Sequence, residues 1–225
     1  MWKLYEGDCL EILGTEIKDD SIDLIITDPP FFMPASHYQS RKGWQRKYSD
    51  LTPLKVFWTE ITKEMARVLK PSGHCFVFCN CDSYPVFYEP MYNHFDKLKS
   101  IIWNKTRVGL GRIFRNQHEM IIWARWKGHK FNNDGKLRAD VLNYPATLSR
   151  KRKHPVEKPV DLLKDLIEPT TIEGDTVLDL FAGGGSLGEA SECLNRNSIL
   201  IELESDYCKT ILDRMNEFEK PLTAF

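Results

Sequence analysis

Hydrophobic residues in this chain form short runs that alternate with stretches of helical spacing. Seven runs have the length and composition of strands, at residues 2–5, 22–27, 75–79, 100–104, 119–125, 176–181 and 198–202. Apolar residues recur at helical spacing at residues 9–13, 54–69, 86–95, 159–167, 189–195 and 206–218. Strands separated by helices predict an α/β fold, with a mostly parallel sheet covered on both faces and a terminal antiparallel hairpin at 100–104 and 119–125.

Two segments lack an apolar period. Residues 33–50 are polar, basic and aromatic, which predicts a long mobile loop, and residues 128–152 are polar and irregular. A chain of 225 residues with 42% hydrophobic and 28% charged residues is most simply one globular domain, spanning residues 1–225.

Targeting signals and metal motifs are missing from the sequence. No apolar run has membrane-spanning length, and residues 1–6 show no signal-peptide pattern, so we expect a cytoplasmic protein without membrane contact. The cysteines are scattered, and the Cys-x-Cys spacing of Cys79 and Cys81 is not usual for zinc. For these two and Cys75 we predict buried, reduced thiols and no metal site.

A strand that ends in Asp28-Pro29-Pro30-Phe31 is the first candidate for chemistry. Two prolines cannot continue a strand or enter a helix interior, because neither has an N–H and each fixes φ. The stiff segment presents a carboxylate, the Pro29 carbonyl and an aromatic ring, which together suit an exocyclic amino group on a planar base. A strand that ends in a proline-rich turn is the alternative explanation.

The second candidate is a strand, a glycine turn, a helix and another strand that ends in an acid. Residues 176–181 lead into Ala182-Gly183-Gly184-Gly185-Ser186-Leu187-Gly188, and residues 198–202 end at Glu202. This is the plan of a nucleotide-binding βαβ unit, and its glycines also satisfy the G-x-G-x-x-G of NAD-dependent oxidoreductases. Asp28, Asp179 and Glu202 all lie at or next to strand ends, so we expect them on one rim of the sheet.

Together the two motifs resemble those of the amino-methyltransferases that act on DNA with S-adenosylmethionine (AdoMet), in which D-P-P-[YF] holds the target amine and D-x-F-x-G-x-G holds AdoMet. The order of the motifs is similar to the beta class. Other segments that resemble the family are Gly7-Asp8-Cys9-Leu10, Trp103-Asn104-Lys105, Asn116-Gln117-His118-Glu119 and His154-Pro155-Val156-Glu157-Lys158-Pro159. The resemblance covers nearly the whole chain and implies a Rossmann-like methyltransferase sheet.

The resemblance also implies roles for individual residues. The catalytic residues would be Asp28, Pro29, Pro30 and Phe31. AdoMet would be bound by Asp8, Cys9, Lys158, Asp179, Phe181, Gly183, Gly185, Ser186 and Glu202, with Lys158 near the methionine carboxylate and Glu202 at the ribose hydroxyls. A surface lysine and a strand-end capping residue are the alternatives for Lys158 and Asp179.

Binding to DNA must depend on local basic patches, because the formal net charge is −1. One cluster comprises Arg41, Lys42, Arg46 and Lys47, and the other Arg150, Lys151, Arg152 and Lys153. Ordinary solvated charge is the alternative. Residues 128–152 correspond to a short target-recognition insert. DNA is the expected partner, and a second copy of the chain and a restriction endonuclease are candidate partners.

The resemblance implies a site-specific enzyme that methylates the N6 amino group of a flipped-out adenine. N4-cytosine methylation is the nearest alternative, although its motif usually begins with serine. Methylation of a cytosine ring carbon requires a nucleophilic cysteine after proline, and no cysteine here follows one. An NAD-dependent oxidoreductase leaves Asp28-Pro29-Pro30-Phe31 unexplained, and a DNA-binding module without activity leaves the acidic motifs unexplained.

Overall fold

The structure is a computed structural model that describes residues 1–32, 50–109, 113–132, 137–147 and 157–219. Its strands are β1 (Trp2–Glu6), β2 (Ile22–Thr27), β3 (Leu69–Cys79), β4 (Lys97–Asn104), β5 (His118–Arg125), β6 (Val141–Asn143), β7 (Thr176–Asp179) and β8 (Asn197–Glu202). Its helices are α1 (Cys9–Glu16), α2 (Leu51–Val68), α3 (Tyr84–His94), α4 (Val160–Ile167), α5 (Ser186–Cys193) and α6 (Ser205–Glu219).

The strands form one sheet in the order β1-β8-β7-β2-β3-β5-β4-β6. Neighbours from β1 to β3 are parallel, β5 is antiparallel to both β3 and β4, and β6 is parallel to β4. The predicted α/β class and mostly parallel sheet are confirmed. The sheet of the described residues has eight strands rather than seven, because β6 pairs with the outer edge of β4, and the hairpin is therefore not terminal.

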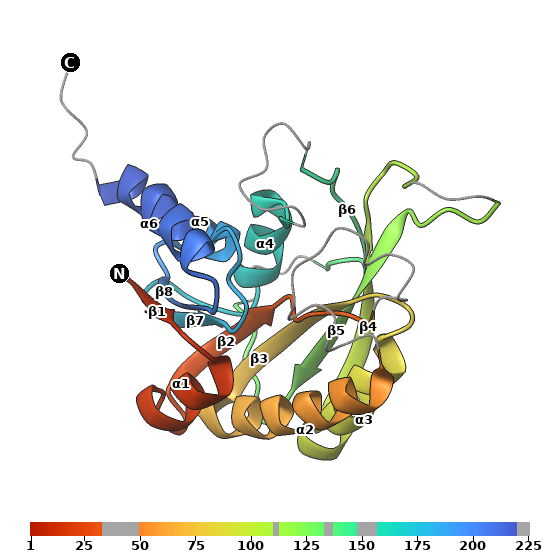
Figure 1. Cartoon of the computed structure of the whole chain (residues 1–225), viewed down its shortest axis with the longest axis horizontal. Helices are drawn as coiled ribbons and strands as arrows, with labels where there is room; N and C mark the ends of the chain where they lie inside the picture. Colours follow the sequence, from red (N-terminus) through yellow and green to blue (C-terminus); the bar gives the residue numbers. More distant parts are fainter. Residues whose placement is uncertain (33–49, 110–112, 133–136, 148–156, 220–225) are drawn as a thin grey trace.

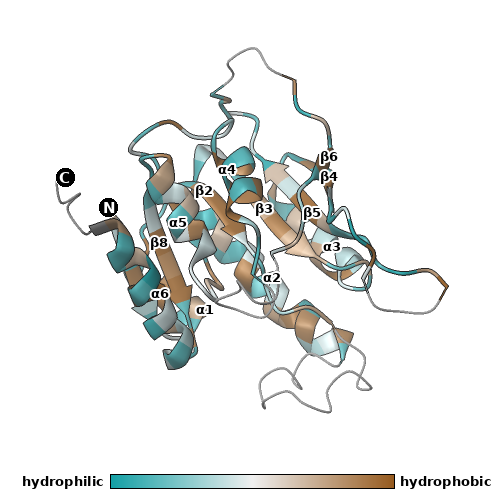
Figure 2. Cartoon of the chain, turned by 90° about the horizontal axis from the view of Figure 1, so that it is seen from above, coloured by the Kyte–Doolittle hydropathy of each residue, from teal (hydrophilic) through white to brown (hydrophobic). Residues whose placement is uncertain are grey.

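Helices cover both faces of the sheet, with α1, α2 and α3 on one side and α4, α5 and α6 on the other (Figure 1). The first layer buries Trp58 of α2 against Phe87 of α3, with ring centroids 4.4 Å apart. The second layer packs Leu162 and Leu166 of α4 and Met215 of α6 against the opposite face. Figure 2 shows the hydrophobic residues concentrated on the central strands between the two layers. Because both faces of the sheet are buried, the central strands consist of nearly continuous runs of apolar residues.

Local signals explain where two helices begin. Asp50 caps α2, because its carboxylate accepts a hydrogen bond from the Thr52 N–H over 2.9 Å. Helix α5 begins at Ser186 rather than at the predicted residue 189, because Gly185 serves as its N-cap in the left-handed conformation, with φ of 78°. Glycine adopts that conformation without a steric penalty.

Two predicted segments coincide with gaps in the description. The predicted loop at 33–50 lies outside the described residues except for Asp50, and the predicted insert at 128–152 is described only in part. Strand β6 lies in this insert, which the sequence predicts to be irregular, because three residues are too few to show a period. Whether the chain forms a single domain stays a prediction.

The cysteines are all free thiols. Cys75 and Cys79 are buried in β3, whereas Cys81 is exposed, so the prediction of a buried thiol is wrong for Cys81, which lies just beyond the end of the strand. In the part of the chain that the structure describes, no cluster of three or more His, Cys, Asp or Glu side chains could hold a metal ion. Over the same residues, no helix is both long and apolar enough to cross a membrane.

Candidate active site

Three acidic residues come together where neighbouring parallel strands end. Strands β2, β7 and β8 lie side by side, and Asp28, Asp179 and Glu202 end or directly follow them. The Thr27 hydroxyl donates to Asp179 Oδ1 over 3.1 Å, which ties the end of β2 to the end of β7. The Gly183 N–H donates to Glu202 Oε2 over 2.7 Å, which ties the glycine turn to the end of β8. The three carboxylates share one rim of the sheet, as their strand-end positions predict.

The segment Asp28-Pro29-Pro30-Phe31 leaves the sheet directly after β2. The next residue anchors it, because the Phe32 N–H donates to Ser83 Oγ over 2.8 Å and Asn80 Nδ2 donates to the Phe32 carbonyl over 2.9 Å. Pro29 is buried, and each proline fixes its own φ. The residues after β3 therefore hold the segment in one conformation beside the sheet.

Asp28 belongs to a cluster of charged side chains that is partly buried. The Lys158 ammonium donates to Asp28 Oδ2 and lies 3.2 Å from Glu119 Oε2. Lys105 Nζ contacts Glu119 Oε1 over 2.5 Å. Two acids and two bases make the cluster neutral when all four are ionised, and this pairing offsets the cost of burying each charge.

Burial and neighbouring charges shift the pKa values in this cluster in different directions. Burial raises the pKa of Asp28 to about 6, because it and the repulsion of Glu119 outweigh the attraction of Lys158. Burial acts to raise the pKa of Glu119 as well. The attraction of Lys158 and Lys105 is stronger than this effect, so the pKa of Glu119 is lowered. Burial acts to lower the pKa of Lys158, yet its two acidic partners raise it. Near neutral pH, Asp28 is therefore the member of the cluster closest to gaining a proton.

A glycine turn connects β7 to α5. Gly183 and Gly185 have φ values of 52° and 78°, and a Cβ added at Gly185 would lie 3.2 Å from Ile211. Ser186 is buried in the first turn of α5, and the ring of Phe181 packs edge-on against Phe57, with centroids 6.2 Å apart. The turn brings its backbone to the same rim as the carboxylates.

Asp179 is a buried carboxylate without a cationic partner among the described residues. It is 8% exposed, and its Oδ1 accepts hydrogen bonds from the Phe181 N–H over 3.1 Å and from the Thr27 hydroxyl. Burial is the main cause that raises the pKa of Asp179 to about 7, and the charges of Asp28 and Glu202 add to the rise. A cationic ligand at this place would favour the ionised carboxylate.

The end of β1 adds two more of the predicted residues to the rim. The Gly7 N–H donates to the Glu202 carbonyl over 2.9 Å, so the turn after β1 lies against the end of β8. The carboxylate of Asp8 caps the first turn of α1. Cys9 is buried, and burial raises the pKa of its thiol to about 12, so it is neutral at physiological pH.

Comparison with known proteins identifies the family. A family model described as DNA methylase matches residues 22–213. The chain belongs to this family of N6/N4 DNA methylases. The type II methyltransferase M.HinfI of Haemophilus influenzae is 30% identical over 249 residues, which cover 96% of this chain and 68% of the relative. M2.MboI of Moraxella bovis is 30% identical over 241 residues, which cover 96% of this chain and 88% of the relative.

Solved structures agree with this assignment. The crystal structure of the M1.HpyAVI–SAM complex matches with a TM-score of 0.73 and 26% identity, covering 96% of this chain and 100% of that chain. Within the N6/N4 DNA methylases, the chain is an AdoMet-dependent enzyme that methylates DNA. The predicted function class, cofactor and DNA substrate are thereby confirmed, and an NAD-dependent oxidoreductase and a module without activity are not supported.

The rim suits the charge of AdoMet. AdoMet carries a positive sulfonium and a positive ammonium, and Asp179 is a buried carboxylate without a cationic partner in the described part of the chain. Glu202 supplies a second carboxylate, and its two oxygens keep acceptor capacity beyond the backbone N–H groups of Gly183 and Glu204. The residues present therefore fit the cofactor.

Two members of the charged cluster are absent from the site residues predicted by the sequence. Glu119 and Lys105 lie on the β4–β5 hairpin, in segments that resemble the family but receive no role in the sequence analysis. An acid at the beginning of an apolar strand is a signal that could have identified Glu119. Both basic clusters predicted to bind DNA, at residues 41–47 and 150–153, lie outside the described residues.

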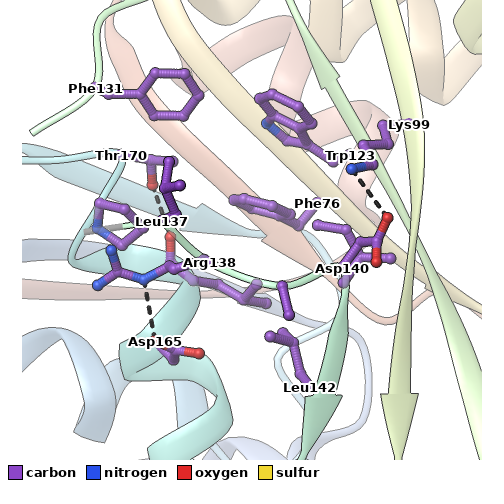
Figure 3. Close-up of a pocket in the computed structure, with 14 residues that line it drawn as sticks. Phe76, Lys99, Trp123, Phe131, Leu137, Arg138, Asp140, Leu142, Asp165 and Thr170 are labelled. Atoms are coloured by element: carbon purple, nitrogen blue, oxygen red, sulfur yellow. Dashed lines mark hydrogen bonds and ion pairs between the residues drawn. The ribbon is translucent and has the colours of Figure 1, made fainter. Parts of the chain in front are cut away.

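A separate cavity of about 270 Å³ lies between α4, the β4–β5 hairpin and residues 137–142. Phe76, Trp123 and Phe131 form much of its wall, and none of the predicted site residues lines it (Figure 3). Arg138 contacts Asp165 of α4 over 3.2 Å, and two further charged residues of the wall form the Lys99–Asp140 ion pair at 3.0 Å. These two ion pairs attach residues 138 and 140 of the insert to α4 and β4.

Proposed function

We propose that this DNA methyltransferase modifies the N6 amino group of an adenine rotated out of the duplex. One observation carries the proposal. Asp28 Oδ1 is buried and accepts no hydrogen bond among the described residues, while Oδ2 is occupied by Lys158. A buried acceptor without a partner is costly unless a ligand satisfies it. An exocyclic amino group is a donor of the required kind, and aspartate at the start of the D-P-P-F motif favours adenine over cytosine.

The residues of the segment would prepare the amine for attack. Asp28 Oδ1 and the Pro29 carbonyl would accept its two hydrogens, which favours a pyramidal nitrogen with a localised lone pair. Phe31 would stack on the base. AdoMet, when bound, supplies an electrophilic methyl group on its sulfonium. As the new N–C bond forms, the bond from the methyl carbon to the sulfonium sulfur would break, with its electron pair remaining on sulfur. The methylated amine becomes acidic, and Asp28 would accept its proton. Positioning of this kind contributes roughly 7–11 kcal/mol to well-aligned reactions.

The other predicted residues would hold the cofactor. Asp179 would face its positive charge, the glycine turn of Gly183 and Gly185 would approach its methionine part, and Glu202 would accept the ribose hydroxyls. Phe181 and Ser186 belong to the same turn, and Asp8 and Cys9 would lie near the adenine ring of the cofactor. This assignment is supported by their common place on the rim.

The target base can be tested in cells. Genomic DNA from a methylation-deficient bacterial host that expresses the protein should contain N6-methyladenine, detected by mass spectrometry of nucleosides, and modification-sensitive sequencing should place it in one sequence context. A host that expresses Asp28→Ala is the matched control. N4-methylcytosine in its place would favour the alternative target, and unmodified DNA with well-expressed protein would contradict the proposal.

Glu202→Gln tests the ribose contact. The substitution keeps the shape of the side chain but removes its charge, and hydrogen bonds to charged groups contribute about 1.5–3 kcal/mol. We therefore expect the AdoMet Kd, measured by calorimetry, to rise roughly 10- to 100-fold. Turnover at saturating AdoMet should fall much less than in Asp28 variants. An unchanged Kd would mean that Glu202 does not contact the cofactor.

Neutralising the first basic cluster tests how DNA is bound. In the variant with glutamine at Arg41, Lys42, Arg46 and Lys47, the slope of log affinity against log salt should flatten by roughly 0.9 for each phosphate that the protein no longer neutralises. The matched control carries glutamine at four exposed lysines away from the carboxyl ends of the parallel strands, Lys18, Lys63, Lys97 and Lys127. AdoMet affinity should be unchanged in both. If both variants show the parental slope, DNA is bound elsewhere.

A further inference from the structure

Lys158 is the most deeply buried cation of the active site, and the function proposed above gives it no role in the reaction. Its side chain is 6% exposed, and its ammonium bridges Asp28 and Glu119. The ammonium also lies 5.1 Å from the centroid of Phe78 and 5.6 Å from that of Phe31. A third ring, that of Trp103, lies 6.0 Å away. Two carboxylates and three aromatic rings therefore surround this charge, and such an enclosure leaves the lysine little conformational freedom.

The pairing treats the two oxygens of Asp28 differently. Oδ2 accepts a hydrogen bond from Lys158, whereas Oδ1 is buried and has no hydrogen-bond partner in the described part of the chain. Glu119 holds the lysine from the other side, and Glu119 is itself held by Lys105 at 2.5 Å. The chain of contacts from Lys105 to Asp28 thus fixes the carboxylate by one oxygen and leaves the second oxygen for another donor.

We propose that Lys158, anchored by Glu119, is a positioning residue for methyl transfer, which turns Asp28 Oδ1 toward the target amine and keeps this carboxylate ionised. The inference rests on the proposed function and adds two residues to its machinery. It also gives the Lys158 ammonium a different partner from the methionine carboxylate of AdoMet, which the family resemblance implies.

Lys158 and Glu119 have opposite effects on the pKa of Asp28, so their roles can be measured separately. Lys158 lies before α4, Glu119 on β5 and Lys105 after β4. Among the described residues, Asp179 and Cys79 also interact electrostatically with Asp28. Apart from burial, which is the largest cause of its raised pKa, Lys158 lowers the pKa of Asp28 and Glu119 raises it. Removing the two charges one at a time should therefore move the titration of Asp28 in opposite directions, which a general loss of packing would not do.

Carbon NMR of protein labelled at the aspartate carboxyl carbons measures this titration directly in the free protein, with Asp28→Asn to assign the signal. Lys158→Met should raise the pKa of Asp28 by about one unit or more, and Glu119→Gln should lower it. Lys164→Met, which removes a lysine from the surface of α4, is the matched control and should leave the signal at its parental position. Lys158→Arg keeps the charge and should restore most of the parental titration.

The pH dependence of methyl transfer should shift in the same directions as the Asp28 titration. In single-turnover methylation at saturating AdoMet and DNA, the acid limb of the rate profile should move to higher pH in Lys158→Met and to lower pH in Glu119→Gln. The AdoMet Kd of Lys158→Met should stay within about threefold of the parent, or roughly 0.6 kcal/mol. A tenfold weaker cofactor with an unmoved Asp28 titration would overturn the inference and place Lys158 at the cofactor. If Lys158→Met does not fold, the Glu119→Gln variant alone tests the inference. An Asp28 pKa that is unchanged or higher in that variant would contradict it.

The NMR titration requires neither DNA nor methyl transfer. Absence of N6-methyladenine in the cellular experiment would therefore contradict the proposed function while leaving the Lys158–Asp28 pairing open to measurement. Opposite shifts with no methylated adenine would show that the charged cluster positions Asp28 for a different amine.

Discussion

Asp28→Ala should abolish most methyl transfer while AdoMet still binds. The variant removes the only carboxylate assigned to the target amine, and a positioned proton acceptor typically contributes about 10²–10⁴-fold to rate. The residues assigned to the cofactor lie after β1, β7 and β8 or at their ends, so the AdoMet Kd should stay within about threefold. Transfer of a tritiated methyl group to DNA and calorimetric titration of AdoMet measure the two effects separately.

Asp28→Asn is the sharper control for this result. It has the shape of aspartate but places an amide in the site. Because Lys158 can only donate, the amide oxygen would take its hydrogen bond, and the NH2 group would then face the target amine, from which it cannot accept a hydrogen bond. We expect it to be nearly as inactive as the alanine variant, which would assign the effect to charge rather than to a cavity. Substantial residual turnover in either variant would show that Asp28 does not hold the amine.

Asp179→Asn should stabilise the free enzyme and weaken its binding of AdoMet. Burial raises the pKa of Asp179 from 3.8 to about 7, so the free protein bears the cost of an ionised buried carboxylate above pH 7. A difference of one pKa unit between the folded and unfolded states corresponds to about 1.4 kcal/mol, and we expect a gain of about 1–3 kcal/mol at pH 8. The AdoMet Kd should rise roughly 10- to 100-fold, because the cofactor loses a charged acceptor.

The pH dependence of this effect has a definite sign. A carboxyl with a raised pKa in the folded state stabilises the fold below its unfolded pKa of about 4, and this contribution is lost as the pH rises through 7. The stability gain of Asp179→Asn should therefore be largest at pH 8 and shrink toward pH 5. Thermal unfolding measures it, since each kcal/mol shifts Tm by roughly 2–4 °C in a domain of this size. Asp213→Asn, at an exposed site on α6, is the control. An equal gain in stability in this control would show that burial of Asp179 is not the cause.

The hydrophobic pattern of the sequence is sufficient to predict that helices cover both faces of a sheet and that three acids lie at the ends of its strands. Residues 22–27 match β2, because a buried parallel strand shows a nearly continuous apolar run, which only Asp23 interrupts before Thr27. The positions of Asp28, Asp179 and Glu202 follow from one rule, that ligands bind at the carboxyl ends of parallel strands. That β2, β7 and β8 are neighbours in the sheet was not readable from local pattern, because strand order depends on packing between distant segments.

The contacts within the charged cluster could not be predicted from the sequence. Lys158 and Glu119 both lie in segments that resemble the family, yet neither segment indicates that the two side chains meet at Asp28. The contact joins β2, β5 and the residues before α4, and Lys158 and Asp28 are 130 positions apart in the sequence. Side-chain pairing over such separations is a property of the folded structure. Strand β6 was missed for a related reason, since its edge pairing with β4 defines it.

The parallel pairing of β1 with β8 has a consequence for synthesis of the protein on the ribosome. Trp2–Glu6 has Asn197–Glu202 as its only strand neighbour among the described residues, so β1 has no strand partner until about 190 further residues have been synthesised. The strands that carry Asp28 and Glu119 can meet much earlier, once β5 has emerged. Because contacts between distant segments form slowly, the part of the site that accepts the base should assemble first and the cofactor part last. A nascent chain should therefore gain AdoMet binding only after β8 has emerged and paired with β1.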